Sequence, residues 1–165
     1  METTSFESYT VDIGASTTAI LSTLDFHQAT KKNKPKIEEG GLVYAQVKED
    51  VDKFHKPILT CMHPTNKKGW MSGEAYYGEL KDGFVIDVNQ EVVWYLLRDD
   101  CHLLHQIGER FEFEINVGFN RKVWVSSPSM HNLVCLIKCI QLADNFVDAD
   151  EKTVAEFISG SFTSA

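Results

Sequence analysis

Six lysines in two clusters are the residues of this sequence best suited to contact phosphate groups. They are Lys31, Lys32, Lys34 and Lys36 in one cluster, and Lys67 and Lys68 in the other. Lysine ammonium groups neutralise the phosphates of a nucleic acid strand, and aromatic rings stack on its bases. The aromatic candidates to accompany these lysines are Phe26, His27 and Tyr9. The alternative interpretation is that the lysines form a solvated loop that contacts another protein subunit.

A cysteine and histidine group suggests a zinc site, but its spacing does not fit one. Cys101, His102 and His105 lie within about one helical turn, and Cys61 and His63 lie elsewhere in the chain. None of these residues has the ligand spacing of a standard zinc site. Core thiols and surface imidazoles are the simpler interpretation, so we expect no metal ion.

Four aspartates could suggest a metal-dependent nuclease: Asp82, Asp87, Asp99 and Asp100. However, Asp82 followed by Gly83 is typical of a turn, and Asp99 or Asp100 is typical of a helix cap. No nucleophile–base pair and no glycine-rich phosphate loop accompanies them. We therefore expect a protein that is not an enzyme, with no catalytic residues, no cofactor and no small-molecule substrate.

The composition is that of an ordinary globular protein with reduced thiols. The 165 residues carry a formal net charge of −8, which argues against nucleic acid binding through bulk positive charge but leaves room for a local basic stripe. The four cysteines form no C-x-x-C motif, which favours an intracellular compartment. No apolar run approaches the length of a membrane helix, and we expect no membrane association.

The first part of the chain has the pattern of a small β domain. Apolar and β-branched residues predict short strands over 9–13, 18–24, 42–47 and 57–62, the last two as partners. A helical turn is an alternative for 18–24. Because no helix separates these segments, the pattern favours a small antiparallel barrel or sheet.

The second part is organised around a β-hairpin at 111–125. Alternating apolar residues predict its two strands, and we expect left-handed backbone at Gly118 and Asn120 in the turn. A strand at 83–88 and two short helices precede the hairpin; Asn89 is the expected cap of the first. A long helix, with Ser127 as its expected N-cap and Pro128 at its first position, follows, and then a final helix. This β-α-α-β-β-α order with an extra helix is that of a KH module, so the predicted fold class is α+β.

Four stretches of sequence carry a resemblance to a known family: 8–16, 29–35 followed by 41–47, 82–88, and 118–125. The most distinctive motif among them is Ala-Thr-Lys-Lys-Asn-Lys-Pro at 29–35. Together they resemble the S1/KH cap subunit of the eukaryotic RNA exosome, the ribosomal RNA-processing protein forty family. The resemblance implies a partial S1 (OB-type) β-barrel over 1–63 and a KH-like domain over 64–165.

This resemblance implies a non-catalytic subunit. Family members sit with other cap subunits on a ring of RNase PH-like subunits, stabilise it, and lead single-stranded RNA to a separate 3′-to-5′ exoribonuclease. Nucleus, nucleolus and cytoplasm are the implied locations. The family's KH unit lacks the G-x-x-G clamp, and here that connection reads Arg98-Asp99-Asp100, whose carboxylates would repel phosphate. A protein-interaction scaffold without direct RNA contact is the alternative function.

The sequence departs from the family in two places. The family turn is Gly-x-Asn-Gly, whereas this chain has Arg121 at the last position, which leaves the packing of Gly118, Asn120, Arg121 and Trp124 open. A left-handed arginine there would cost about 1 kcal/mol. In addition, only four of the five strands of an S1 barrel can be placed. Either the chain is shortened at its N-terminus relative to the family, or another chain closes the barrel.

Overall fold

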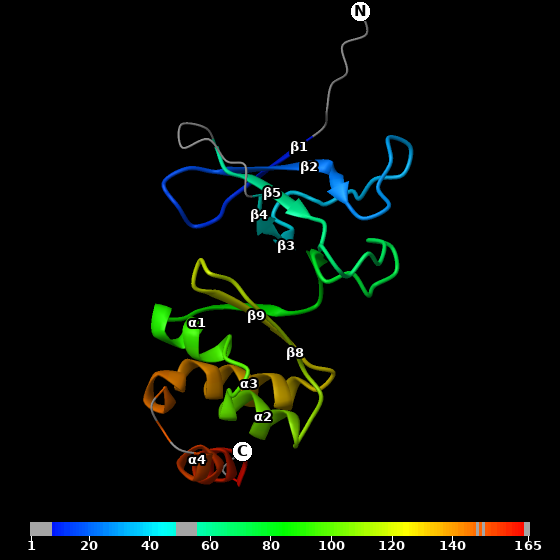
Figure 1. The fold of residues 1–165 in the computed structure, drawn as a ribbon. Coiled ribbons are helices and arrows are strands. Elements are labelled where there is room, and N and C mark those ends of the chain that lie inside the picture. The colour runs from blue at the N-terminus through cyan, green and yellow to red at the C-terminus, as the bar shows by residue number, and fades with distance from the viewer. Residues whose placement is uncertain (1–7, 49–55, 148, 150, 164–165) are drawn as a thin grey trace, which may run out of the picture. The chain divides into compact units, whose positions relative to one another are not determined.

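The chain forms two units in the computed structural model, Met1–Lys81 and Asp82–Ala165 (Figure 1). Each unit has its own hydrophobic core. The structure describes residues 8–48, 56–147, 149 and 151–163. The sequence predicted the division between residues 63 and 64, whereas the structure divides the chain after Lys81.

The main sheet of the first unit has four strands. β1 (Ser8–Val11), β2 (Ala19–Phe26), β5 (Ile58–Cys61) and β4 (Gln46–Val47) are hydrogen-bonded in that order. The β1–β2 and β4–β5 pairs are antiparallel, and the latter confirms the predicted partnership of 42–47 with 57–62. β2 and β5 run parallel, with an irregular register between Leu21 and Phe26. The sheet is therefore mixed.

A second, two-stranded sheet explains where the first unit ends. β3 (Leu42–Tyr44) pairs antiparallel with β6 (Gly78–Leu80), so the turn-rich segment between residues 64 and 77 returns to the first unit. The strand predicted over 42–47 is interrupted at Ala45, and its two parts join different sheets. β6 was not predicted, because three residues are too few to show an alternating pattern.

The second unit is a three-stranded antiparallel sheet covered by helices. β7 (Phe84–Asp87), β9 (Lys122–Ser126) and β8 (Glu114–Val117) are adjacent in that order. In Figure 1, three helices lie along one side of this sheet: α1 (Gln90–Leu96), α2 (His102–Gly108) and α3 (Met130–Gln141). A 3₁₀ helix (Ala143–Phe146) and α4 (Glu151–Thr163) follow, and α4 packs against α2 and α3. The predicted β-α-α-β-β-α order with an added helix is confirmed.

The helix starts differ from expectation at two of three places. Asn89 is the N-cap of α1, as predicted, although its side chain donates to Asp144 at 2.6 Å rather than to the helix. Cys101, not Asp99 or Asp100, precedes α2. The N-cap of α3 is Ser129, so Ser127 and Pro128 lie before the helix, and the Ser127 hydroxyl donates to the Glu112 carbonyl at 3.0 Å.

The β8–β9 turn uses its residues differently from the prediction. Arg121 has φ +65°, and neither Gly118 nor Asn120 is among the residues with positive φ. Gly118 is needed for space instead, because a Cβ there would lie 2.3 Å from Asn120 Oδ1 and 3.0 Å from the Lys122 carbonyl. The Gly118 amide donates to that carbonyl at 2.9 Å, and the Arg121 amide donates to the Gly118 carbonyl at 3.1 Å. The turn is thus closely fixed around a left-handed arginine.

Replacing Arg121 by glycine is expected to raise the free energy of unfolding by up to about 1 kcal/mol, because left-handed backbone is costly for arginine and not for glycine. The greater entropy that glycine gives the unfolded chain reduces this gain. Urea denaturation followed by circular dichroism measures the change. Asn120→Gly is the matched control and should lower stability, because φ of Asn120 is not positive and its Oδ1 accepts from the Lys122 amide at 3.4 Å. A loss of stability in both variants would contradict this account.

Candidate nucleic-acid interface

The first lysine cluster lies on a loop that the body of the first unit holds in place. The Thr30 and Asn33 backbones exchange hydrogen bonds at 2.7 and 3.1 Å, which makes a tight turn in the middle of the cluster. Lys31, Lys32 and Lys36 are exposed, whereas Lys34 is half-buried. The loop therefore presents at least three ammonium groups to solvent from a defined backbone.

Tyr9 anchors this lysine loop. Its hydroxyl donates to the Pro35 carbonyl at 2.7 Å and accepts from the Ile37 amide at 3.1 Å, while its ring packs against the core of the first unit. The structure thus gives Tyr9 a positioning role; its stacking on a base stays a prediction.

Tyr9→Phe is expected to lower the free energy of unfolding by about 1 kcal/mol, because two hydrogen bonds to the loop backbone are lost. Faster amide hydrogen exchange at Ile37 and its neighbours would show that the loop is loosened. Tyr76→Phe serves as the control, because Tyr76 is 53% exposed. Unchanged exchange in the Tyr9 variant would contradict the anchoring role.

The two other aromatic candidates occupy different environments. Phe26 is 2% exposed and packs in the core, which leaves no ring face for a base and corrects the predicted stacking role. It stands at the end of β2, after the register irregularity that breaks the alternation of the strand, and its side chain is buried there. His27, the next residue, is half-buried, and its Nε2 accepts from the His63 amide at 2.9 Å.

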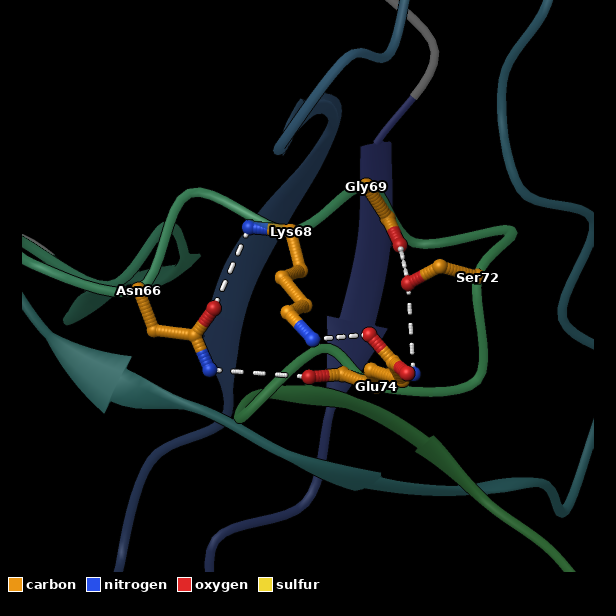
Figure 2. A network of polar contacts seen from close by, with 5 residues as sticks. All are labelled: Asn66, Lys68, Gly69, Ser72 and Glu74. Atoms are coloured by element: carbon orange, nitrogen blue, oxygen red, sulfur yellow. Dashed lines mark hydrogen bonds and ion pairs between the residues drawn. The ribbon is translucent and has the colours of Figure 1, made fainter.

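The second lysine cluster belongs to a segment that contacts the first loop. The Asn33 amide group lies 3.2 Å from Met71 Sδ, and the Trp70 amide donates to the His27 carbonyl at 3.3 Å. Figure 2 shows how this segment is held: Lys68 forms an ion pair with Glu74, and Asn66 bonds to the backbone of both. Lys68 is therefore partly neutralised, whereas Lys67 forms no ion pair with any residue of the described ranges.

Lys67 lies on the wall of a shallow groove of about 610 Å³ in the first unit. Its lining includes both histidines and exposed apolar surface: His27, Gln46, Val47, Lys48, Thr60, Met62, His63, Pro64 and Lys67. Lys48 pairs with Asp25 at 2.5 Å. Sequence reasoning did not select Gln46, Lys48 or Met62, because they are scattered over three segments that only the fold brings together.

An aromatic cluster adjoins this groove through His63. The His63 ring centroid lies 4.8 Å from that of Tyr76 and 5.6 Å from that of Tyr77, and Tyr44 packs against both tyrosines. Burial raises the pKa of Tyr44 to about 12, so its hydroxyl remains neutral. Tyr76 is 53% exposed, so part of its ring is open to solvent beside His63 of the groove wall.

The first unit thus combines the two kinds of group that a single strand of nucleic acid requires. Exposed lysines can contact phosphates, and Tyr76 and the imidazoles beside the groove can contact bases. Among the residues that the structure describes, no three histidine, cysteine or acidic side chains are arranged to hold a metal ion. In the same part of the chain, no helix has the length and hydrophobicity required to cross a bilayer.

The second unit lacks the clamp by which KH modules hold a nucleic acid backbone. The α1–α2 connection contains no glycine, and the Arg98 guanidinium makes two hydrogen bonds of 2.8 Å to the Asp100 carboxylate. This pair holds the pKa of Asp100 below its usual range, so the carboxylate stays charged. A phosphate there would meet acidic side chains instead of free backbone amides.

The fold and the candidate interface define a chain of the S1–KH class, with an S1-type β unit followed by a KH-type unit. Residues 1–72 match the model for the S1 domain of "Exosome complex component RRP40", and residues 83–131 match a KH domain model. Identity to exosome component RRP40 is 34% in Schizosaccharomyces pombe, 35% in Drosophila melanogaster and 32% in Saccharomyces cerevisiae. The chain belongs to the RRP40 family of exosome components.

The similarity covers most of this chain but only part of each relative. The alignments span 88%, 80% and 93% of this chain, and 58%, 54% and 65% of the three relatives in the same order. The chain therefore spans little more than half the length of the first two. A crystal structure described as a candidate exosome complex RNA-binding protein shares the fold, with a TM-score of 0.64 over 99% of this chain and 90% of its own, at 20% identity.

Proposed function

We propose that this chain is a non-catalytic cap subunit of an RNA exosome. It binds a ring of RNase PH-like subunits and the other cap subunits, stabilises that ring, and guides single-stranded RNA toward a separate 3′-to-5′ exoribonuclease. It acts in RNA processing and decay in the nucleus, nucleolus and cytoplasm. Family membership supports the place in the complex.

One observation supports the RNA-guiding role: the lysine loop and the groove lie in the same unit, and Asn33 of the loop contacts Met71, four residues after Lys67 of the groove wall. That unit is also the one matched by the S1 model. Residues 1–81 carry 11 acidic and ten basic residues, so the unit is nearly neutral and its lysines are not masked by a strongly negative body. RNA bound along this surface would follow exposed lysines and then the histidine-lined groove.

The second candidate function, a protein-interaction scaffold without RNA contact, is favoured by the charge of the other unit. Residues 82–165 carry 13 acidic residues against six basic ones. Such a surface repels RNA and suits protein contacts. The two functions differ in what the first unit does, so RNA binding by the chain separates them.

The proposed function is tested by reconstitution. The full chain is mixed with purified ring and cap subunits of the same organism, and co-elution on a sizing column reports assembly. Labelled oligouridine then reports RNA affinity at several salt concentrations, for the free chain and the complex. We expect assembly and RNA binding that weakens as salt rises. Failure to co-elute would contradict the cap role, and assembly without any RNA binding would support the scaffold.

A further inference from the structure

Three exposed apolar side chains of the second unit lie near one another: Trp94 and Leu97 of the α1 region, and Phe119 of the β8–β9 turn. The Trp94 and Phe119 rings meet edge to face, with centroids 5.7 Å apart. Leu97 lies three residues after Trp94, which places both on the same side of the helix. Trp94 is 57% exposed, Leu97 41% and Phe119 68%. We call these three residues the aromatic patch.

The aromatic patch stands on a rigid base. The opposite side of α1 is buried in the core through Val92, Val93, Tyr95 and Leu96. Phe119 sits in the turn fixed by the Gly118 and Arg121 backbone hydrogen bonds. Large apolar side chains held in place by a rigid scaffold, with little entropy to lose, are typical of the anchors of protein interfaces.

The charges around the aromatic patch indicate what binds there. Arg98 is paired with Asp100, and Lys122 is paired with Asp87 at 2.6 Å. One turn before Trp94 on the same side of α1 is the exposed carboxylate Glu91. Arg98 and Lys122 are thus paired with acidic neighbours, whereas Arg121, in the turn beside Phe119, is exposed and forms no ion pair with a described residue, so the negative sign comes mainly from Glu91 and from the unit as a whole.

The second unit as a whole is also negatively charged. Its 13 acidic and six basic residues give it nearly all of the chain's net charge of −8. A phosphate backbone is repelled by such a unit, whereas a basic protein surface is attracted. The acidic α1–α2 connection, which follows Leu97, also attracts basic groups and repels phosphate.

We propose that the aromatic patch is a docking site for a protein segment in which a large apolar side chain is flanked by lysine or arginine. The segment comes from another subunit of the complex, and in this respect the inference rests on the proposed function. Its apolar side chain packs on the Trp94 and Phe119 rings, and its basic residues face Glu91 and the acidic connection.

Trp94 itself reports occupancy of the aromatic patch. Of the three tryptophans, Trp124 is 6% exposed and Trp70 is half-buried, so acrylamide quenches mainly Trp94 in the free chain. A Trp94→Phe variant assigns the signal. We expect quenching of Trp94 to fall severalfold in the reconstituted, RNA-free complex and to stay unchanged when oligouridine alone is added to the chain.

Substitutions then measure the contribution of the aromatic patch. The Leu97→Ser/Phe119→Ser variant should bind the complex at least about tenfold more weakly. Met130→Ser is the matched control: Met130 is 66% exposed but lies on α3, and its loss should leave affinity unchanged. Circular dichroism checks that each variant is folded. The quenching experiment on the unmodified chain tests the docking site even if a variant fails to fold.

Each other outcome contradicts the inference in a distinguishable way. If the chain assembles but acrylamide quenches Trp94 in the complex as strongly as in the free chain, the docking site is wrong and the proposed function stands. Protection of Trp94 by oligouridine would show that the aromatic patch binds RNA instead. Failure of the chain to enter the complex would contradict both the inference and the proposed function.

Discussion

The Gly83→Ala substitution is expected to lower the free energy of unfolding of the second unit by about 1–3 kcal/mol, an overpacking cost. The Cβ of that alanine would lie 2.3 Å from Cε2 and Nε1 of Trp124 and 2.6 Å from its Cζ2. Trp124 is 6% exposed and sits in the central strand β9, so its indole has little space into which to move. Urea denaturation followed by far-ultraviolet circular dichroism measures the effect.

Gly108→Ala is the matched control for this substitution. A Cβ there would lie 3.9 Å from Phe113, an ordinary contact, and alanine is the better helix former at the end of α2. Its stability should stay equal or rise slightly. In a Trp124→Phe background the cost of Gly83→Ala should shrink, because the smaller ring leaves room. Full stability of Gly83→Ala in the unmodified background would contradict the close packing.

Reversing three charges on the lysine loop is expected to weaken binding of single-stranded RNA by at least about tenfold, and to reduce the slope of log affinity against log salt by about 2. The variant changes Lys31, Lys32 and Lys36 to glutamate, since all three are exposed. Lys34 is left in place because it is half-buried. Fluorescence anisotropy with labelled oligouridine at several salt concentrations gives both quantities.

A second triple variant controls for net charge in this experiment. Lys81, Lys138 and Lys152 are exposed lysines outside the loop, and changing them to glutamate alters the net charge equally. That variant should keep most of the RNA affinity and the full salt slope. Equal losses in both variants would mean that RNA responds to overall charge, and no loss in either would remove the loop from the RNA path.

The order of elements was predictable from sequence where patterns are long. The alternation over 111–117 and the helical spacing after Ser129 each extend over enough residues to identify a strand and a helix. Both elements form, although β8 begins only at Glu114. β6 and the break at Ala45 were not predictable, because three-residue strands are selected by pairing across the fold. The N-cap of α2 is Cys101 and not the predicted Asp99 or Asp100, because the Asp100 carboxylate binds Arg98 instead of the helix.

The candidate interface was only partly predictable for a similar reason. Charge density along the chain identified the exposed lysines of the loop. It could not show that Tyr9 anchors the loop, that Phe26 faces the core, or that Glu74 neutralises Lys68, since these depend on contacts between distant segments. Gly118 was correctly singled out, but its role is to leave room for Asn120, which only the folded turn reveals.

The parallel pairing of β2 with β5 also sets the earliest point at which the main sheet of the first unit can form on the ribosome. Ile20 and Leu21 meet Ile58 and Leu59, so the central pair of this sheet joins residues separated by nearly forty positions. Local hairpins such as β1–β2 can form early, but this distant pairing carries a loop-closure cost that delays folding. During synthesis the nascent lysine loop is therefore complete before the strand that secures its base, and it awaits the emergence of Cys61.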